Sequence, residues 1–498
     1  MKKLFQLILI YIMVFAFVCA GGGALAATGG PDTLTIALDL DITSIDPMNH
    51  NETITAFVTN MCTSRLFVFD ENMNIENELA ESWEYLDDTR LQIAIKKGIK
   101  FHDGTEMKAG DVAASLMRAT KMPKVSYVVS AVENVEVTDD YTVIIHTSRP
   151  FAPLMGNLIH PGCSILSKAQ IDSGDFSKIN GSGPYKFVRW QTGNEIVLER
   201  FDDYFDKRYA GDFAQMVFKV IPEGTSRTIA LEAGDVDLIT TLDSIDYKRV
   251  ADSKNLKAIE VLANHIFYMS MNIEKPPFDN QLVRQAMNYA IDKEGVLMVA
   301  ENGHGETLRS ITPDKILGWK DNGYSYDPAK AAELLEQAGY PGGKGLSVTI
   351  TTYGEDRVGP VLQANMADLG IDAQVSNMDR GAFLDRVNKG DFMAALSGWT
   401  TSSDPDRFLA SLLHSRGIGS NNNARYTMAD ELIDQGASTI GDEARKEIYN
   451  RIHEQVMDDA PWVPLYSRMI IMAGTSKYTY PANMLDPVGN AQFNRIRK

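Results

Sequence analysis

The sequence predicts an α/β protein with more than one domain. Its 498 residues are 44% hydrophobic, which suits a large globular protein with more than one packed core. From about Ala258 onward, strand-like segments alternate with helical ones, a pattern that predicts a mainly parallel sheet covered by helices. Between Phe67 and about Asn180 the pattern changes, and short strands with short helices predict a β-rich region.

The first 26 residues have the features of a secretory signal peptide. Lys2 and Lys3 precede an apolar run from Leu4 to Val18, and the small-residue sequence Ala24-Leu25-Ala26 follows. We therefore expect cleavage after Ala26, with a retained membrane helix as the alternative. Cys19 does not follow a small residue, which favours a soluble exported protein over a lipid-anchored one.

Charge and cysteine content limit the possible functions. The formal net charge is −18, and loss of the two signal-peptide lysines makes the mature chain −20, which argues against a nucleic-acid partner. Cys62 and Cys163 remain after cleavage. An oxidising compartment would allow a disulfide between them, but two cysteines so far apart in sequence fit two buried thiols equally well.

The mature chain begins with a strand, a polar loop and a helix. Thr33 to Leu38 alternates in the manner of a strand, and a helix is expected from about Thr53 to Leu66. The loop between them carries the polar tip Met48-Asn49-His50-Asn51. Ligands of α/β proteins often bind beyond the ends of such strands, so this tip is a candidate binding segment.

The β-rich region and the segment after it contain recognisable strands, helices and turns. The expected elements are a strand at Leu91–Ile95, a helix from Lys108 to Arg118, a hairpin of Val132–Val137 with Thr142–His146, strands at Glu195–Phe201 and Met216–Ile221, a helix at Thr225–Glu232 and a strand at Gly234–Ile239. Gly181-Ser182-Gly183-Pro184 is predicted to be a tight passage of the backbone, because its glycines allow sharp changes of direction.

The alternating second half predicts two βαβ units and a long final helix. The expected elements are a strand at Ile266–Ile273, helices at Leu282–Ile291 and from Pro328 to Ala338, a strand at Leu346–Thr351, a helix at Val358–Leu369, a strand at Ile371–Val375, a helix at Phe383–Asn388, a helix at Ala444–Met457 and a strand at Met469–Ala473. Asp327 is the expected N-cap of its helix, since Pro328 occupies the first helical position.

The segment from Ala394 to Asp406 is predicted to be the floor of a pocket. A strand-like run leads into Gly398-Trp399, followed by four hydroxyl residues and Asp404. Trp399 would supply a flat apolar wall, and Thr400, Thr401, Ser402 and Asp404 would supply oriented hydrogen bonds. The alternative is a buried tryptophan followed by an ordinary loop, in which Asp404 caps a helix at Pro405.

The common catalytic signatures are missing from the sequence. It contains no G-x-S-x-G, H-E-x-x-H, C-x-x-C or Walker A motif, and its eight histidines form no close pair. These absences favour binding over catalysis, and we expect neither an enzyme nor a cofactor or metal site.

Six short motifs follow one another along the mature chain. They are Leu79-Ala80-Glu81-Ser82-Trp83, Gly98 to Gly104 with Ala109 to Val112, Gly181 to Tyr185, Pro277-Phe278-Asp279 with Val283 to Asp292, Tyr326-Asp327-Pro328 through Tyr340, and Ala460 to Leu465. In this order they resemble the extracytoplasmic solute-binding proteins of the peptide/nickel class (family 5), the receptors of ABC importers. The resemblance covers nearly the whole mature chain.

The resemblance implies a two-lobed periplasmic-binding-protein fold of type II, with an extra subdomain and the ligand in the interlobe cleft. It implies a signal peptide at residues 1–26 and a first lobe made of residues 27–66, 182–268 and 471–498. The extra β-rich subdomain would be residues 67–181, and the second lobe residues 269–470. Its implied partners are a peptide-like solute and the permease subunits in the inner membrane, and we expect a periplasmic monomer.

The resemblance also places the Trp399 segment in the cleft. Dipeptide and oligopeptide receptors of this class have, three residues after this tryptophan, an Asp that binds the peptide α-ammonium, and here that position is Ser402. The hydroxyl-rich segment is more similar to the glutathione-receptor branch. Asn49, His50, Arg380 and Arg407 are further candidates to line the cleft, and for each the alternative is a solvated surface residue.

The sequence leaves the ligand open. The main interpretation is a receptor for a dipeptide, oligopeptide or glutathione-like solute. A receptor for a nickel or other metal chelate or for haem, with Met48 and His50 as the candidate ligands, is the alternative. An exported hydrolase on an unrelated fold is the third.

Overall fold

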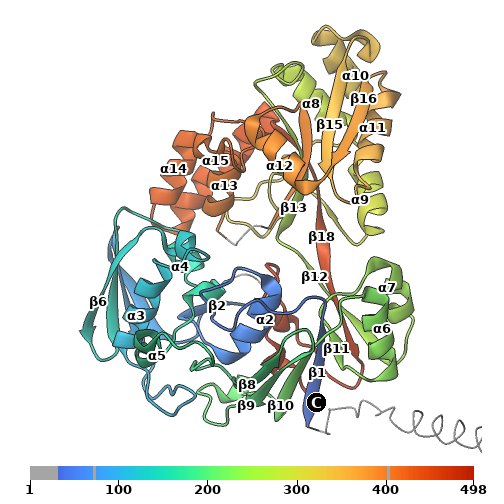
Figure 1. The fold of residues 1–498 in the computed structure, drawn as a ribbon. Helices are drawn as coiled ribbons and strands as arrows, with labels where there is room; N and C mark the ends of the chain where they lie inside the picture. The colour runs from blue at the N-terminus through green and yellow to red at the C-terminus, as the bar shows by residue number, and fades with distance from the viewer. Residues whose placement is uncertain (1–31, 71–73, 401–403) are drawn as a thin grey trace, which may run out of the picture.

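The computed structural model describes residues 32–70, 74–400 and 404–498, which form two lobes and a β-rich subdomain (Figure 1). The signal peptide expected at residues 1–26, with Cys19, lies outside the described residues. The figure shows one lobe above the other, with the β-rich subdomain beside the lower lobe and under helices of the upper one. Within the described part of the chain, none of the helices combines the length and apolar composition needed to cross a membrane.

The lower lobe, here called lobe I, is built on one half of a 12-stranded mixed sheet. Its elements are β1 (Thr33–Leu38), α2 (Thr53–Cys62), β8 (Tyr185–Gln191), β9 (Glu195–Arg200), β10 (Gln215–Val220), α6 (Gly224–Ala233), β11 (Leu238–Ile239), α7 (Ser244–Ala251), β12 (Leu256–Leu262) and the C-terminal half of β18 (Trp462–Thr475). The strand order is β18-β11-β1-β10-β9-β8, and β1 pairs in parallel with both neighbours. Leu34, Ile36 and Leu38 enter one core and Ala37 another, so β1 is buried on both faces.

The β-rich subdomain is an antiparallel sheet covered by short helices. Its elements are β2 (Phe67–Phe69), β3 (Ile75–Asn77), β4 (Ala80–Asp87), β5 (Arg90–Ile95), α3 (Ala109–Ala119), β6 (Val132–Asp139), β7 (Thr142–Thr147), α4 (Leu154–Asn157) and α5 (Lys168–Ser173). The four main strands lie in the order β4-β5-β7-β6, and their inward side chains form a separate core with α3. This confirms the β-rich region and the hairpin that the sequence predicts.

The upper lobe, lobe II, contains the other half of the large sheet. Its elements are β13 (His265–Met271), α8 (Gln281–Ala290), α9 (Lys293–Glu301), β14 (Gly305–Thr307), α10 (Pro328–Gln337), β15 (Ser347–Tyr353), α11 (Gly359–Asp368), β16 (Asp372–Met378), α12 (Arg380–Lys389), β17 (Ala394–Thr400), α13 (Asp406–Leu412), α14 (Asp430–Ser438), α15 (Asp442–Asp459) and the N-terminal half of β18. Asp327 caps α10 as predicted, because its Oδ1 accepts a hydrogen bond from the Lys330 backbone N at 2.9 Å.

The sheet of lobe II is mixed and not mainly parallel, which corrects the prediction from the sequence. β15 pairs in parallel with β16 and β17, but β13 pairs antiparallel with both β17 and β18. The reason is topological. The chain enters this lobe through β13 and leaves through β18, and two neighbouring strands that enter and leave by the same end must run in opposite directions.

Strand β18 is the backbone link between the lobes. The sequence predicts a strand only at Met469–Ala473, whereas β18 extends from Trp462 to Thr475 and belongs to both halves of the sheet. The prediction stops short because Pro464 lacks the N–H that a continuous ladder needs. The strand tolerates this proline where the pairing with β13 shifts register between Phe267 and Tyr268.

The two cysteines that follow the signal peptide are both buried free thiols. Burial raises the pKa of Cys62 and of Cys163, so both are inert neutral side chains near neutral pH. Of the two alternatives that the sequence leaves open, the structure has the two thiols.

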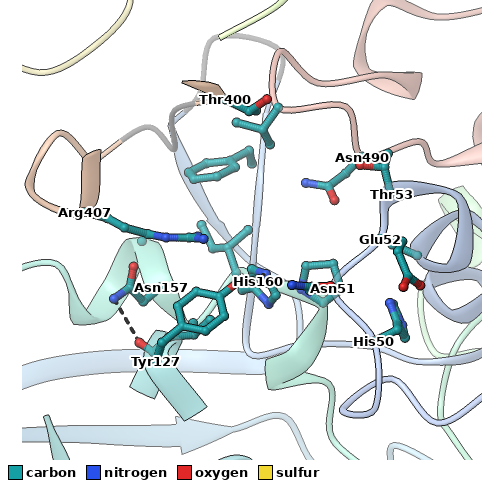
Figure 2. A pocket seen from close by; sticks show the side chains of 17 residues that line it. His50, Asn51, Glu52, Thr53, Tyr127, Asn157, His160, Thr400, Arg407 and Asn490 are labelled. Atoms are coloured by element: carbon teal, nitrogen blue, oxygen red, sulfur yellow. Dashed lines mark hydrogen bonds between the residues drawn. The ribbon is translucent and has the colours of Figure 1, made fainter. Parts of the chain in front are cut away.

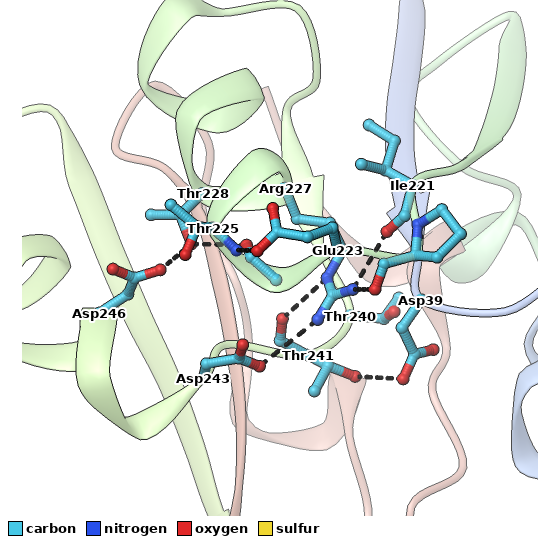
Figure 3. A network of polar contacts seen from close by, with 12 residues as sticks. Asp39, Ile221, Glu223, Thr225, Arg227, Thr228, Thr240, Thr241, Asp243 and Asp246 are labelled. Atoms are coloured by element: carbon cyan, nitrogen blue, oxygen red, sulfur yellow. Dashed lines mark hydrogen bonds and ion pairs between the residues drawn. The ribbon is translucent and has the colours of Figure 1, made fainter.

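Arg227 ties the ends of the lobe I strands together (Figure 3). Its buried guanidinium donates to the backbone carbonyls of Ile221 and Pro222 at 3.0 and 2.7 Å, and to that of Thr241 at 3.3 Å. The hydroxyl of Thr241 in turn donates to Asp39, just after β1. The carboxyl ends of β1, β10 and β11 are thus fixed at one edge, and the loop from β1 to α2 departs from that edge.

Candidate ligand-binding site

A pocket of about 310 Å³ lies where lobe I, the β-rich subdomain and lobe II meet (Figure 2). We call it the interlobe pocket. Its lining residues are His50, Asn51, Glu52, Thr53, Ala56, Val488 and Asn490 from lobe I, Phe69, Tyr127, Val128, Gly156, Asn157, Ile159, His160 and Pro161 from the β-rich subdomain, and Thr400 and Arg407 from lobe II. Because all three units contribute, any relative movement of the lobes changes the shape of this pocket.

The loop between β1 and α2 supplies the lobe I side of the pocket. Asp46 anchors this loop, since both its oxygens accept hydrogen bonds from Arg118 of α3, at 2.9 and 2.6 Å. His50 is 2% exposed, and its Nε2 lies 3.3 Å from the hydroxyl of Thr59. Its Nδ1 is buried and has no hydrogen-bond partner among the described residues. Burial lowers the pKa of His50, so the imidazole is neutral near neutral pH.

Glu52 is the second residue after His50, and one of its two carboxylate oxygens accepts hydrogen bonds. Its Oε2 accepts hydrogen bonds from the hydroxyls of Thr43 and Thr55, at 2.5 and 3.1 Å. The bond from Thr43, helped by that from Thr55, lowers the pKa of Glu52, which is therefore ionised. No Lys, Arg or His side chain of the described residues lies within ion-pair distance of it. The lobe I rim of the pocket thus carries a fixed negative charge.

His160 and Tyr127 form the wall that the β-rich subdomain contributes. Nδ1 of His160 accepts a hydrogen bond from the backbone N of Gly162 at 3.0 Å, and Nε2 lies 3.5 Å from the Tyr127 hydroxyl. Loss of solvent, with a smaller effect from the nearby positive charge of Arg407, lowers the pKa of His160 to about 3. The imidazole is therefore neutral, and since Nδ1 is an acceptor, Nε2 carries the proton and can donate.

Arg407, near the start of α13, reaches the pocket from lobe II. Its guanidinium lies over the ring of Tyr127, 4.5 Å from the ring centroid, so a lobe II cation contacts the β-rich subdomain across the pocket. In residues 32–70, 74–400 and 404–498, no carboxylate lies within ion-pair distance of this guanidinium. Figure 2 shows the side chain extending over the pocket toward Tyr127 and His160.

The segment predicted to be the pocket floor divides between the pocket and the core. Thr400 is the last residue of β17 and lines the pocket. Successive side chains of a strand point to opposite faces, and Trp399 accordingly packs against the core formed around α13 and α15. Thr401 and Ser402 lie outside the described residues.

Asp404 is engaged in a buried ion pair and is not part of the pocket lining. Both its oxygens accept hydrogen bonds from the guanidinium of Arg445 in α15, at 2.6 and 2.9 Å. Oδ1 also accepts from the backbone N of Asp406 at 2.9 Å. Burial, together with the negative charge of Asp404, raises the pKa of Asp406 to about 7. Asp404 therefore fixes the start of α13, the helix that carries Arg407.

The structure brings together three of the nine residues that the sequence nominates: His50, Thr400 and Arg407. Asn49 and Arg380 are exposed and do not line the pocket, and Arg380 begins α12. Ligand contact by these two residues, by Trp399 and by Asp404 stays a prediction. Sequence reasoning missed Glu52, although it is the second residue after the nominated His50. It also missed Tyr127 and His160, which belong to no motif and are placed here only by folding.

A second pocket, of about 390 Å³, lies on lobe II at the carboxyl end of β15. Its floor includes the rings of Phe267 and Tyr466, which are stacked with their centroids 5.0 Å apart. Charged residues at its edge are Glu301, Glu355, Asp356 and Arg357. This pocket and the interlobe pocket both border β17, through Leu396 and Ser397 in one case and Thr400 in the other.

The alternative ligand, a metal chelate, has no matching cluster of metal-binding side chains in the described part of the chain. Nowhere in it do three His, Cys, Asp or Glu side chains come together as metal ligands. Met48 lies in the core of the β-rich subdomain and is fully buried. His50 therefore has no sulfur partner at the pocket surface.

Comparison with known proteins identifies the family. Residues 74–420 match the family model described as bacterial extracellular solute-binding proteins, family 5 middle region. The chain belongs to family 5 of the bacterial extracellular solute-binding proteins. This confirms the resemblance seen in the motifs and the two-lobed α/β fold.

The family 5 relatives have different ligands in their names. Heme-binding protein A of Haemophilus influenzae is 29% identical over 449 residues, covering 81% of each chain. The glutathione-binding protein GsiB of Pectobacterium atrosepticum is 29% identical over 469 residues, covering 89% of this chain and 90% of that protein. These relatives are named as binding proteins and not as enzymes.

Two solved structures have the same fold. The ABC transporter-associated periplasmic binding protein DppA of Helicobacter pylori, in complex with the peptide STSA, is 27% identical with a TM-score of 0.72, covering 93% of this chain and 98% of that one. HbpA2 of Haemophilus parasuis is 24% identical with a TM-score of 0.84, covering 93% and 99%. The second likeness shows the fold alone.

Proposed function

We propose that this protein is the substrate-binding receptor of an ABC importer, which captures a peptide-like solute in the periplasm and delivers it to the membrane permease by lobe closure. The observation that carries the proposal is the interlobe pocket, whose polar and charged lining comes from both lobes and the β-rich subdomain. A ligand bound there contacts both lobes at once, so it favours a closed state over an open one.

The connection between the lobes supports such a movement. The chain crosses from lobe I to lobe II between β12 and β13, and returns along β18. At the crossing, the backbone N of Ala263 donates to the carbonyl of Arg468 at 3.0 Å. Two adjacent crossings leave the lobes free to rotate about one line, while the rest of each lobe keeps its own core.

The ligand contacts that we propose begin with His50, Thr400 and Arg407. Thr401 and Ser402 follow Thr400 directly and belong to the same proposed binding segment. Asp404 and Trp399 hold the two ends of this segment, through Arg445 and through the lobe II core. These contacts combine neutral hydrogen bonds with the positive charge of Arg407, which suits a small peptide or glutathione.

We further propose that the chain is exported, is cleaved near Ala26 and works as a periplasmic monomer without catalytic turnover. The motif content of the sequence, the binding function of the family 5 relatives and the signal-like N-terminus support these statements. The proposed partner, besides the solute, is the permease in the inner membrane.

Haem is a second candidate ligand, because two histidines line the interlobe pocket. His50 has a buried, unpartnered Nδ1, and a neutral imidazole nitrogen is a common ligand of haem iron. One relative, 29% identical, is a heme-binding protein.

A ligand panel tests the proposal. We expect a dipeptide or glutathione to raise the melting temperature, since a ligand at 100 times its Kd adds about 2.7 kcal/mol to the free energy of unfolding. Chromatography of the same mixture should recover the peptide uncleaved. Free amino acids serve as control probes. A shift with haem alone would support the second candidate, and no shift with dipeptides, oligopeptides, glutathione or haem would contradict the proposal.

A further inference from the structure

We propose that the interlobe pocket selects zwitterionic ligands, with Glu52 receiving the ammonium end and Arg407 the carboxylate end. This inference rests on the proposed function and adds the charge pattern of its substrate class. Figure 2 shows the two side chains on opposite sides of the pocket, Arg407 from lobe II and Glu52 from lobe I.

Glu52 is prepared to accept a cation. Both of its threonine hydrogen bonds go to Oε2, and they fix the orientation of the carboxylate. Oε1 accepts no hydrogen bond from the residues that the structure describes. The group is ionised, and the positive charge of Lys124 acts on it without forming an ion pair. One oxygen of a fixed carboxylate is thus left for a ligand.

Arg407 is prepared to accept an anion. The guanidinium of Arg407 lies over the face of the Tyr127 ring. The ring face does not accept hydrogen bonds from the N–H groups at the guanidinium edge, so these remain available to a ligand. The adjacent His160 is neutral with a proton on Nε2, so it adds a second donor and no competing charge. The other arginines described above are engaged: Arg118 and Arg445 by carboxylates, and Arg227 by backbone carbonyls and by Asp243.

The two charges do not neutralise each other. No ion pair joins Glu52 to Arg407, and because Glu52 is exposed and Arg407 half-buried, solvent water reaches both charges. Lobe closure removes that water, and an unpaired charge that loses its water is costly. A ligand with an ammonium and a carboxylate relieves both costs, whereas a ligand with only one of these groups leaves one protein charge unpaired. Selection then comes mainly from the penalty on the wrong ligand.

Isothermal titration calorimetry with modified peptides tests the inference. The probes are Ala-Ala and Met-Leu, each also as its N-acetylated and its C-amidated form, and unmodified glutathione. For the parent protein we expect N-acetylation and C-amidation each to weaken binding at least tenfold. Glu52→Gln should remove the penalty for N-acetylation and keep that for amidation, and Arg407→Gln should do the reverse.

The controls are Glu447→Gln and Arg451→Gln, which change the same residue types on the exposed face of α15. Both should retain the parent's two penalties, and circular dichroism should show all four variants folded. If the parent binds a peptide but Glu52→Gln and Arg407→Gln discriminate as the parent does, this inference is wrong and the proposed function stands. If the parent binds none of the three unmodified probes, the peptide function itself is wrong, and the inference with it.

Discussion

At the scale of single residues, two arginines near the candidate site have different roles. Arg445 is 3% exposed and donates two hydrogen bonds to Asp404, which fixes the start of α13. Arg407 lies on the same helix, three residues after Asp404, and has no carboxylate partner in the described chain. Arg445 therefore positions α13, whereas the guanidinium of Arg407 is available to a ligand in the pocket. The sequence shows both as charged residues and cannot tell them apart.

Arg445→Met should destabilise lobe II, because it removes the guanidinium that donates two hydrogen bonds to the buried carboxylate of Asp404. We expect a loss of about 3–5 kcal/mol in the free energy of unfolding, measured by urea denaturation. Arg451→Gln, on the exposed face of the same helix, is the control and should change it by less than about 0.5 kcal/mol.

The double variant Asp404→Asn with Arg445→Met should recover part of that loss, since it removes both members of the buried ion pair. A single variant Arg445→Met as stable as the parent would show that solvent reaches Asp404 and that the pair does not anchor α13.

At the scale of elements, close contact with α2 explains why the passage Gly181-Ser182-Gly183-Pro184 contains glycines. The sequence predicts a tight passage from the glycines alone. The structure shows that this segment crosses the end of α2, with its backbone against that of Cys62 and Thr63. A Cβ on Gly183 would lie 2.5 Å from the carbonyl carbon of Cys62, closer than atoms can pack. The passage holds the β-rich subdomain against lobe I.

Gly183→Ala should therefore destabilise the protein, because the clashing atoms belong to backbone and cannot rotate away. We expect a loss of about 1–3 kcal/mol in the free energy of unfolding. Gly110→Ala is the matched control, since nothing lies within 4 Å of its Cβ position in α3. It should be neutral or raise stability by up to about 1 kcal/mol. Equal effects of the two substitutions in thermal denaturation would contradict the close approach.

At the scale of the whole molecule, the interlobe pocket depends on how three units meet. β18 runs through both halves of the sheet, so lobe I and lobe II share one strand. The β-rich subdomain also touches lobe II directly, where the backbone N of Ala152 donates to the carbonyl of Ala437 at 3.0 Å. Lobe II is thus joined to lobe I through the shared strand and to the β-rich subdomain through this second contact.

Binding of a peptide or glutathione should bring the lobes closer together. Fluorescent labels on Thr192→Cys in lobe I and Glu336→Cys in lobe II should show higher energy transfer when the probe is added. The native Cys62 and Cys163 are each 1% exposed and should not react. Labels at Glu336→Cys and Glu447→Cys, both in lobe II, are the control and should not respond. Tight binding with unchanged transfer between the lobes would contradict closure.

The sequence by itself determined the local elements and the family. β1 has the bounds that alternation predicts, Asp327 caps α10 as its place before Pro328 indicates, and six motifs point to the family that the comparison confirms. These features depend on residues close together in the chain, where side-chain period, capping and turn chemistry act. The same local information placed His50, Thr400 and Arg407 among the candidates.

Only the tertiary structure decided which candidates meet and what their charges do. Asp46 pairs with Arg118, 72 positions later in the sequence, and Asp404 pairs with Arg445, 41 positions later. Strand β18 belongs to both lobes. Long-range pairings of this kind depend on the packing of whole elements, and no local pattern encodes them. The opposed charges of Glu52 and Arg407 became visible for the same reason, because 355 residues separate two side chains that line one pocket.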